Sequence, residues 1–128
     1  MTAQIEAAQR LYDAFAARDP QAILASLHPD FVGEVSAGMP LGVGGHYEGA
    51  ETMLREVWAP VLANYEMSVE AEELLPSGDD LVVAIGHYRG SERATGAEVE
   101  AAFAHVLRID AGRIASLRQI TDTASWTA

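Results

Sequence analysis

This chain has 128 residues, the length of one domain, and we expect a single domain over residues 1–128. It has no cysteine, which excludes disulfides, thiolate metal sites and a cysteine nucleophile. Eight basic against nineteen acidic side chains give a net charge of -11, which repels nucleic acid and anionic membrane surfaces. No signal peptide and no stretch of membrane-spanning length is visible, so we expect a cytoplasmic protein.

Three helices are predicted in the first half of the chain. Thr2 is placed to cap the first helix, which ends at residues 18–20 and carries apolar side chains at helical spacing: Ile5, Ala8, Leu11, Tyr12, Phe15 and Ala16. A second, short helix follows, and its buried side carries Ile23, Leu24 and Leu27. The third helix is predicted over residues 50–64, with a kink at Pro60 because proline removes a helical hydrogen bond.

The remaining segments are predicted as strands, turns and one loop. Five glycines and a proline fall within residues 38–49, which indicates a mobile loop after a short strand at residues 31–36. Further strands are predicted at residues 67–75, 81–89, 99–109 and 114–121, with hairpin turns at residues 77–80 and 110–113. Helices followed by a meander of strands are typical of an α+β fold, with the helices packed on one face of an antiparallel sheet.

The last hairpin predicts which side chains face the helices. If Ala111 and Gly112 form a two-residue turn, Ile109 pairs with Ile114 and His105 lies opposite Arg118. Because side chains alternate along a strand, the core-facing positions are Val99, Ala101, Phe103, His105, Leu107, Ile109, Ile114, Ser116, Arg118, Ile120 and Asp122. The opposite face is small and apolar enough to pack against a second subunit, which predicts a homodimer through the outer face of the sheet.

Three ionisable side chains, His105, Arg118 and Asp122, share the predicted core-facing surface. Burying them is costly unless they are hydrogen-bonded or line a wet cavity, so they are the candidate catalytic groups. A structural role stays open for each, as a satisfied core residue or, for Asp122, as a cap of the C-terminal segment. Asp122 lies about 13 Å along the strand from Arg118 at ~3.3 Å per residue, so we expect His105 and Asp122 at different ends of a ligand.

Two further features of the chain leave alternatives open. One of His87 and Tyr88 must face the pocket, and alternation does not decide which. Residues 38–49 are either a lid or a solvated connection. The four histidines have no metal-ligand spacing, so no metal site is predicted.

The most specific stretch of the chain is residues 103–126, FAHVLRIDAGRIASLRQITDTASW. With the runs at residues 27–32 and 86–96, it resembles the NTF2-like superfamily and, within it, the SnoaL-like and ketosteroid-isomerase-related group. The resemblance implies a cone-shaped barrel, in which a curved antiparallel sheet wraps around N-terminal helices and encloses an apolar pocket. It also implies a homodimer, and neither a metal nor an organic cofactor.

The resemblance carries over to individual residues only in part. Asp122 matches the acid/base aspartate of SnoaL-like cyclases, and His105 falls at the oxyanion-hole acid of ketosteroid isomerases. Leu11 and Val35 stand where those isomerases have a tyrosine and the catalytic aspartate, which argues against a steroid isomerase. Arg118 and Asp122 match two members of the Arg/Asp/Asp set of limonene-type epoxide hydrolases, but no second aspartate shares their face.

The leading hypothesis is a cofactor-free acid/base enzyme that acts on a small apolar carbonyl compound as an isomerase, cyclase or dehydratase. Its catalytic residues are expected to be Asp122, His105 and Arg118, and its substrate pocket is expected to be lined by Tyr12, Phe15, Trp58, His87, Phe103 and Ile120. One alternative is an epoxide hydrolase of the limonene type, in which Asp122 and Arg118 position water. Another is a non-catalytic dimer that binds a small ligand.

Overall fold

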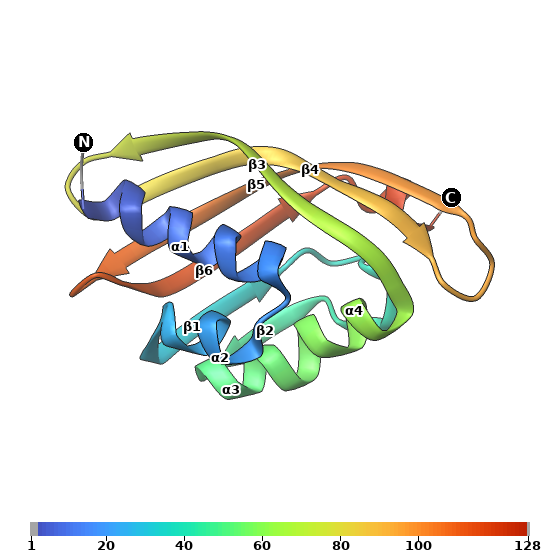
Figure 1. Ribbon diagram of the computed structural model, residues 1–128, viewed down its shortest axis with the longest axis horizontal. Helices are drawn as coiled ribbons and strands as arrows, with labels where there is room; N and C mark the ends of the chain where they lie inside the picture. Colours follow the sequence, from blue (N-terminus) through green and yellow to red (C-terminus); the bar gives the residue numbers. More distant parts are fainter. Residues whose placement is uncertain (1–2, 128) are drawn as a thin grey trace.

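A six-stranded sheet curves around helix α1 (Ala3–Ala17) in the computed structural model, which describes residues 3–127 (Figure 1). The predicted cap Thr2 lies outside the described residues. The strand order is β2-β1-β6-β5-β4-β3, and every pair is antiparallel except the parallel pair β1/β6. Strands β2 and β3 are the two edges, so the sheet is curved but not closed. The predicted α+β fold is confirmed.

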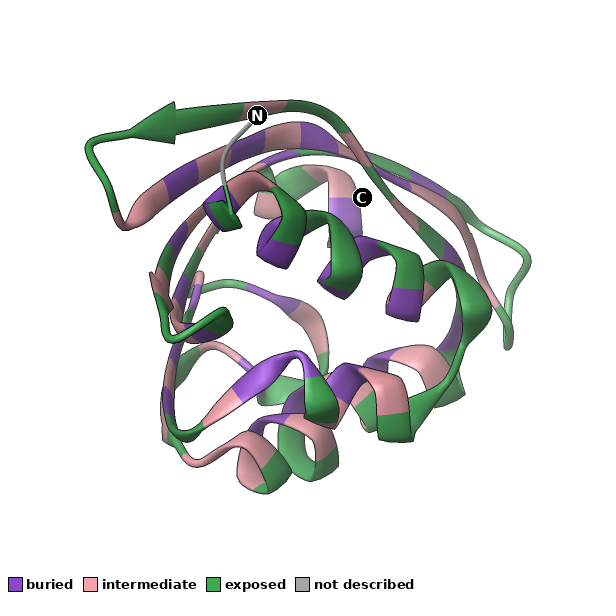
Figure 2. Cartoon of the chain, turned by 60° about the vertical axis from the view of Figure 1, so that its left-hand side comes forward, coloured by how far each residue is buried: buried purple, intermediate pink, exposed green. Residues whose placement is uncertain are grey.

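Helices and strands alternate up to residue 64, and from residue 65 to residue 121 the chain forms four consecutive strands. The strands are β1 (Leu27–Val35), β2 (Gly45–Glu48), β3 (Tyr65–Ser77), β4 (Leu81–Glu92), β5 (Glu98–Asp110) and β6 (Arg113–Thr121). The other helices are α2 (Pro20–Ala25), α3 (Ala50–Met53), α4 (Ala59–Asn64) and α5 (Thr123–Thr127), with a 3₁₀ turn at Pro40–Gly42 and a π-helical segment at Leu54–Trp58. In Figure 2 the sheet arches over α1, and the buried residues of its strands alternate with more exposed ones.

The core lies between α1 and the concave face of the sheet. Ala8, Leu11 and Tyr12 form the buried side of α1 and are at most 4% exposed. The next helix, α2, begins where Asp19 caps it, because the Asp19 carboxylate accepts hydrogen bonds from the backbone N–H groups of Gln21 and Ala22. Within residues 3–127 no helix has the length and apolar character needed to cross a bilayer.

Residues 38–49 differ in part from the predicted loop. Residues 45–48 form β2, which pairs with β1 from Val32↔Glu48 to Val35↔Gly45. The prediction of a loop was therefore wrong for this segment. Strand β2 is a short edge strand that pairs only with β1, and none of its residues is buried. Its sequence therefore carries no alternation of apolar and polar residues from which a strand could be predicted.

The third predicted helix, residues 50–64, is present as three consecutive helical segments. Its irregularity lies just before Pro60, where Leu54–Trp58 is π-helical and the Ala59 N–H donates to the Leu54 carbonyl. A π-helical turn widens a helix and is a recognised cause of local distortion. It turns Val57 and Trp58 toward the interior, where both line the pocket.

Two glycines on the inner face of β4 allow β3 to bend closely over it. A Cβ atom at Gly86 would lie 1.9 Å from the carbonyl oxygen of Glu70, and one at Gly90 would lie 1.9 Å from that of Glu66. No side chain fits at either position without moving the backbone of β3. These glycines therefore permit the strong curvature of this half of the sheet.

Strand β6 contains one more residue than β5 near their shared turn. The turn is the predicted two-residue one, with positive φ at Ala111 and Gly112, and Ile109 pairs with Ile114. The next pair is Arg108↔Ser116, so β6 advances two residues where β5 advances one. This is a β-bulge, which shifts every later pair by one residue.

The bulge reverses the predicted orientation of the rest of β6. His105 lies opposite Gln119, not opposite Arg118. A slip of one residue moves each side chain to the other face of the sheet. The predicted core-facing positions of Arg118, Ile120 and Asp122 are therefore wrong, and all three side chains are exposed.

Gly86→Ala is expected to lower the free energy of unfolding by roughly 3 kcal/mol or more, because the new methyl group overlaps the Glu70 carbonyl. Urea denaturation followed by circular dichroism measures this loss. Gly78→Ala is the control: Gly78 has a φ of +65° but open space around it. Its substitution adds only the backbone strain of about 1 kcal/mol. Equal losses in the two variants would contradict the role given to Gly86.

Candidate functional site

A small cavity of about 50 Å³ lies between α1, the helical segments of residues 50–64, the concave face of the sheet and α5. Its lining is almost wholly apolar and consists of Phe15, Val35, Met39, Met53, Val57, Trp58, Val61, Leu62, Met67, Val69, Tyr88, His105, Leu117, Gln119 and Trp126. The cavity holds only a few water molecules, so a larger ligand requires lining side chains to move. Three methionines are placed to do so, because their unbranched side chains repack readily.

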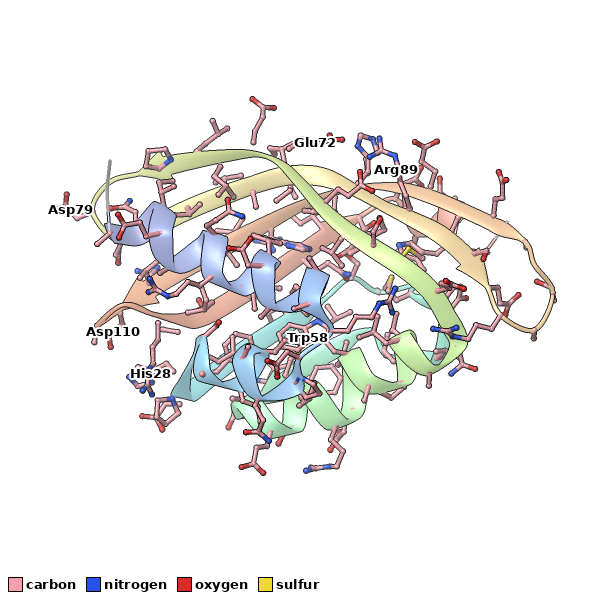
Figure 3. All side chains as sticks on the ribbon, in the orientation of Figure 1. His28, Trp58, Glu72, Asp79, Arg89 and Asp110 are labelled. Atoms are coloured by element: carbon pink, nitrogen blue, oxygen red, sulfur yellow. The ribbon has the colours of Figure 1, made fainter. Side chains whose placement is uncertain are left out.

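Phe15 and Trp58 lie on the partly exposed side of the pocket. Their rings meet edge to face with centroids 5.1 Å apart, which joins α1 to the helical segment opposite. Figure 3 shows Trp58 between α1 and the helices beneath it. Both residues are half-buried, as is Leu62, so this side of the pocket reaches the surface.

The polar groups of the pocket form one buried network centred on His105. Its Nδ1 is 2.7 Å from the Tyr12 hydroxyl, and its Nε2 is 2.6 Å from the Tyr88 hydroxyl. Phe103 stacks on the imidazole at a centroid distance of 4.0 Å. Strand β5 places His105 and Phe103 on the same inner face because they are two residues apart.

Gln119 completes this network, and its orientation is determined by a backbone group. The Ser36 N–H can only donate, and it donates to Gln119 Oε1 at 3.2 Å. The amide nitrogen of Gln119 therefore faces the other way and donates to the Tyr88 oxygen at 2.9 Å. The Tyr88 oxygen thus already accepts one hydrogen bond from the protein.

All members of the network are neutral near pH 7. Burial lowers the pKa of His105 from 6.5 to about 3. Burial also raises the pKa of both Tyr12 and Tyr88 above their ordinary range, so both hydroxyls stay protonated. A neutral imidazole has one N–H donor and one acceptor nitrogen, so His105 donates to one tyrosine and accepts from the other.

The tautomer of His105 follows from counting donors and acceptors. If Nδ1 carried the proton, His105 would donate to Tyr12, and the Tyr12 hydroxyl hydrogen would have no acceptor among the described residues, at a position away from the cavity. We therefore assign the proton to Nε2, so that Tyr12 donates to His105 and His105 donates to Tyr88.

With this tautomer, Tyr88 has one unused group, the hydrogen of its hydroxyl. Its oxygen accepts from both His105 and Gln119, while its own O–H has no acceptor within residues 3–127. Tyr88 lines the pocket, whereas Tyr12 does not. Two donors on a phenol oxygen polarise its O–H, which strengthens the hydrogen bond that it can donate. The network therefore leaves one neutral hydrogen-bond donor, the Tyr88 hydroxyl, without a partner among the described residues.

The structure brings together some of the residues expected in the site. His105, Phe15 and Trp58 line the cavity. Tyr12 and Phe103 lie directly behind the lining, where Tyr12 bonds to His105 and Phe103 stacks on it. These five residues surround the same space.

Four expected site residues lie outside the pocket. His87 points to the outer face, where its Nδ1 is 3.0 Å from a Glu72 carboxylate oxygen; Figure 3 shows Glu72 on that outer side. Ile120 is 47% exposed. Arg118 and Asp122 are exposed because of the bulge in β6, and the Asp122 carboxylate accepts a hydrogen bond from the Ser125 hydroxyl at 2.7 Å.

Several pocket residues were not predicted from the sequence. Tyr88 faces the pocket, which settles the open choice between it and His87. Gln119 was assigned to the wrong face by the register. Met39 and Trp126 come from segments predicted as a loop and a tail, so no periodic pattern marked them. Within the part of the chain described here, no three His, Asp or Glu side chains are arranged to hold a metal ion.

The fold consists of a curved, unclosed sheet that wraps around N-terminal helices, with an apolar cavity between them. The chain resembles several solved structures of this kind. An NTF2-like protein from Burkholderia thailandensis is 30% identical with a TM-score of 0.86, over 97% of this chain and 94% of that one. TerC, co-crystallised with polyporic acid, is 28% identical with a TM-score of 0.87, over 98% and 95%.

A Pseudomonas putida protein described as a polyketide cyclase shares the fold at 20% identity and a TM-score of 0.84, over 98% of this chain and 96% of that one. No curated protein matches the chain. The family model of the SnoaL-like domain matches residues 8–117. The chain therefore belongs to the SnoaL-like family, and the resemblance identified from the sequence is confirmed.

Replacing His105 is expected to change how stability depends on pH. The pKa of His105 is lowered on folding, so its contribution is present above pH 6.5 and is lost as the pH falls toward 3. Between pH 7 and pH 5 the wild-type protein should lose about 2 kcal/mol of unfolding free energy from this group alone. His105→Gln, which keeps one donor and one acceptor, should lack this loss in urea denaturation at each pH.

The matched control is His87→Gln, since His87 lies on the outer face. This variant keeps His105 and should therefore still lose unfolding free energy between pH 7 and pH 5. An unchanged pH dependence in His105→Gln would show that His105 does not titrate as a buried neutral group.

Proposed function

We propose that this protein binds a small, mostly apolar carbonyl compound and promotes proton transfer at the carbon beside the carbonyl group, the step that isomerases and cyclases of such compounds share. The Tyr88 hydroxyl carries this proposal. Tyr88 lines an apolar cavity, its oxygen is held by His105 and Gln119, and with the tautomer assigned to His105 its hydrogen has no acceptor among the described residues. A carbonyl oxygen is the complementary group, because it accepts a hydrogen bond and carries no charge into the apolar pocket.

The proposed chemistry follows from where negative charge develops. When the C–H bond beside the carbonyl breaks, its electron pair forms the carbon–carbon double bond of an enolate and charge moves to the oxygen. A fixed donor in an apolar site stabilises that oxygen more than it stabilises the starting carbonyl. Among residues 3–127 no carboxylate lines the pocket, so the proton leaves to water or to a basic group of the substrate itself.

The geometry argues against the epoxide-hydrolase hypothesis. That reaction needs Asp122 and Arg118 to hold a water molecule inside the pocket. Both side chains are exposed, and neither lines the cavity. Under this proposal neither side chain takes part in the proton transfer.

Binding without turnover is the second candidate function. It is favoured by the absence of a carboxylate from the lining and by the small cavity of about 50 Å³. Under this alternative Tyr88 still donates to the ligand oxygen, but no proton is transferred. An exchange assay therefore separates the two candidates.

The outer face of the sheet supports a proposal about assembly. Six apolar side chains form a continuous outer patch across four strands, Leu75, Val83, Ile85, Ala104, Val106 and Ile120. Opposite charges flank it, Glu73 on β3 and Arg118 on β6, and neither forms an ion pair within residues 3–127. A twofold axis parallel to the strands would bring β6 of one copy over β3 of the other, so the patch is complementary to a second copy of this chain.

Tyr88→Phe is expected to weaken 2-heptanone binding about tenfold, because the ligand carbonyl loses its one donor. Isothermal titration calorimetry measures this affinity. In deuterium oxide, exchange at the central carbon of 2,4-pentanedione, followed by proton NMR, should be roughly 100-fold slower in the variant than in the wild-type protein. Ketone binding without protein-catalysed exchange would favour the non-catalytic alternative.

Tyr65→Phe is the matched control for Tyr88→Phe. Tyr65 is also buried, at 4% exposed, but it does not line the cavity. It should bind 2-heptanone as the wild-type protein does. An equal loss of affinity in both variants would exclude a specific hydrogen bond from Tyr88.

Ile120→Glu is expected to shift the protein from dimer to monomer, because it places a charge in the outer patch. Sedimentation velocity at micromolar concentration measures the assembly state. The control is Leu41→Glu, since Leu41 is as exposed, at 51%, but lies away from the sheet. A wild-type monomer at these concentrations, or a dimer that survives Ile120→Glu, would overturn the proposed assembly.

A further inference from the structure

Of the described residues of the C-terminal helix α5, one side chain lines the pocket. Trp126 lines the cavity and is 4% exposed. Its indole meets the rings of Tyr88 and Tyr65 edge to face, with centroids 5.0 and 5.3 Å away. Its N–H donates to the Thr121 hydroxyl at 3.2 Å. The indole thus lies directly beside the tyrosine that carries the proposed ligand contact.

Helix α5 has five residues, too few to be stable by itself, so it depends on contacts with the rest of the fold. Asp122 supplies one such contact, to β5, and two hydrogen bonds to Ser125 within the first turn of α5. Its N–H donates to the Ala102 carbonyl on β5 at 3.2 Å, which ties the start of α5 to the sheet. Its carbonyl accepts from the Ser125 N–H at 3.1 Å, and its carboxylate accepts from the Ser125 hydroxyl at 2.7 Å.

The loop before β2 supports α5 from the other side. A Cβ atom at Gly38 would lie only 3.1 Å from the Thr123 hydroxyl, so the loop backbone packs closely against the start of α5. The next residue, Met39, lines the same cavity. Trp126 is therefore fixed between the sheet and this loop, whereas Trp58 stands on the partly exposed side of the pocket.

We propose that Trp126 is the end wall of the pocket and sets the longest ligand that it accepts, and that Asp122 is a positioning residue that holds α5, and with it Trp126, in place. This inference rests on the proposed function in one respect, since it takes Tyr88 as the point where the ligand carbonyl is held. In this proposal Asp122 touches no ligand. It affects the preferred ligand length only through the position of Trp126.

The test is a titration of the 2-alkanones from 2-butanone to 2-decanone by calorimetry. In the wild-type protein the affinity should rise about fourfold per added methylene, reach a maximum and then fall. In Trp126→Ala the maximum should move to ketones roughly three carbons longer, because the indole leaves a cavity at the closed end. A maximum at the wild-type length would overturn the inference.

Trp58→Ala is the size-matched control. It removes an indole from the partly exposed side of the pocket, so the affinity for all ketones should fall together and the preferred length should stay unchanged. A shift in preferred length equal to that of Trp126→Ala would also overturn the inference, since the end of the pocket would then have no special role.

The positioning role of Asp122 is tested with Asp122→Asn, Asp122→Ala and Ser125→Ala. Asparagine still accepts a hydrogen bond from Ser125, so Asp122→Asn should keep the wild-type length preference. Asp122→Ala and Ser125→Ala should both broaden it toward longer ketones. With Trp58→Phe as background, Trp126 is the one remaining tryptophan, and its emission should shift to the red in both alanine variants. Equal behaviour of Asp122→Asn and Asp122→Ala would refute the positioning role.

Linear 1-alkenes of matched length separate this inference from the proposed function. If ketones bind no better than alkenes and Tyr88→Phe changes nothing, the proposed function fails, and the alkene series still decides whether Trp126 limits length. If ketones bind through Tyr88 but Trp126→Ala leaves the preferred length unchanged, only the inference about Trp126 fails. If neither series binds the wild-type protein, both fail.

Discussion

One extra residue in β6 decides what chemistry the pocket contains. The bulge between Ile114 and Ser116 turns Gln119 toward the concave face and turns Arg118 and Asp122 outward. Without it, a cation and a carboxylate would share the interior with His105, and each buried charge would need a partner. With it, the interior polar groups are all neutral, which allows a narrow, nearly apolar cavity to be stable.

The direction of the hydrogen bonds in the site follows from groups that can form them in only one sense. The Ser36 backbone N–H can only donate, and this orients the Gln119 amide toward Tyr88. Burial keeps His105 neutral, so it must donate on one side and accept on the other. The remaining freedom is the hydrogen of the Tyr88 hydroxyl, on a residue that lines the cavity. Under the proposed function, this chain of hydrogen bonds is ordered before a ligand arrives, as the stabilisation of developing charge by fixed donors requires.

Local patterns predicted much of this fold, and long-range geometry explains what they missed. The Ala111–Gly112 turn and the inner position of His105 depend on a two-residue hairpin and on strand alternation, which sequence carries directly. The bulge cannot be predicted in this way. With the bulge β6 places Leu117 inward and without it Ile120, so the apolar pattern does not distinguish the two registers. His87 and Tyr88 are equally ambiguous, because both side chains have apolar and polar parts. Trp126 lies in a five-residue helix that exists only through its contacts.

The uncharged lining also makes the pocket an electrostatic filter. The chain as a whole carries a net charge of -11, and none of the residues that line the cavity carries a charge near pH 7. An anionic metabolite must approach through a negative potential and then finds no cation to replace its hydration. A neutral molecule meets neither barrier. Under the proposed function, selection by charge would therefore precede selection by shape, and the entry of neutral ligands would be insensitive to ionic strength.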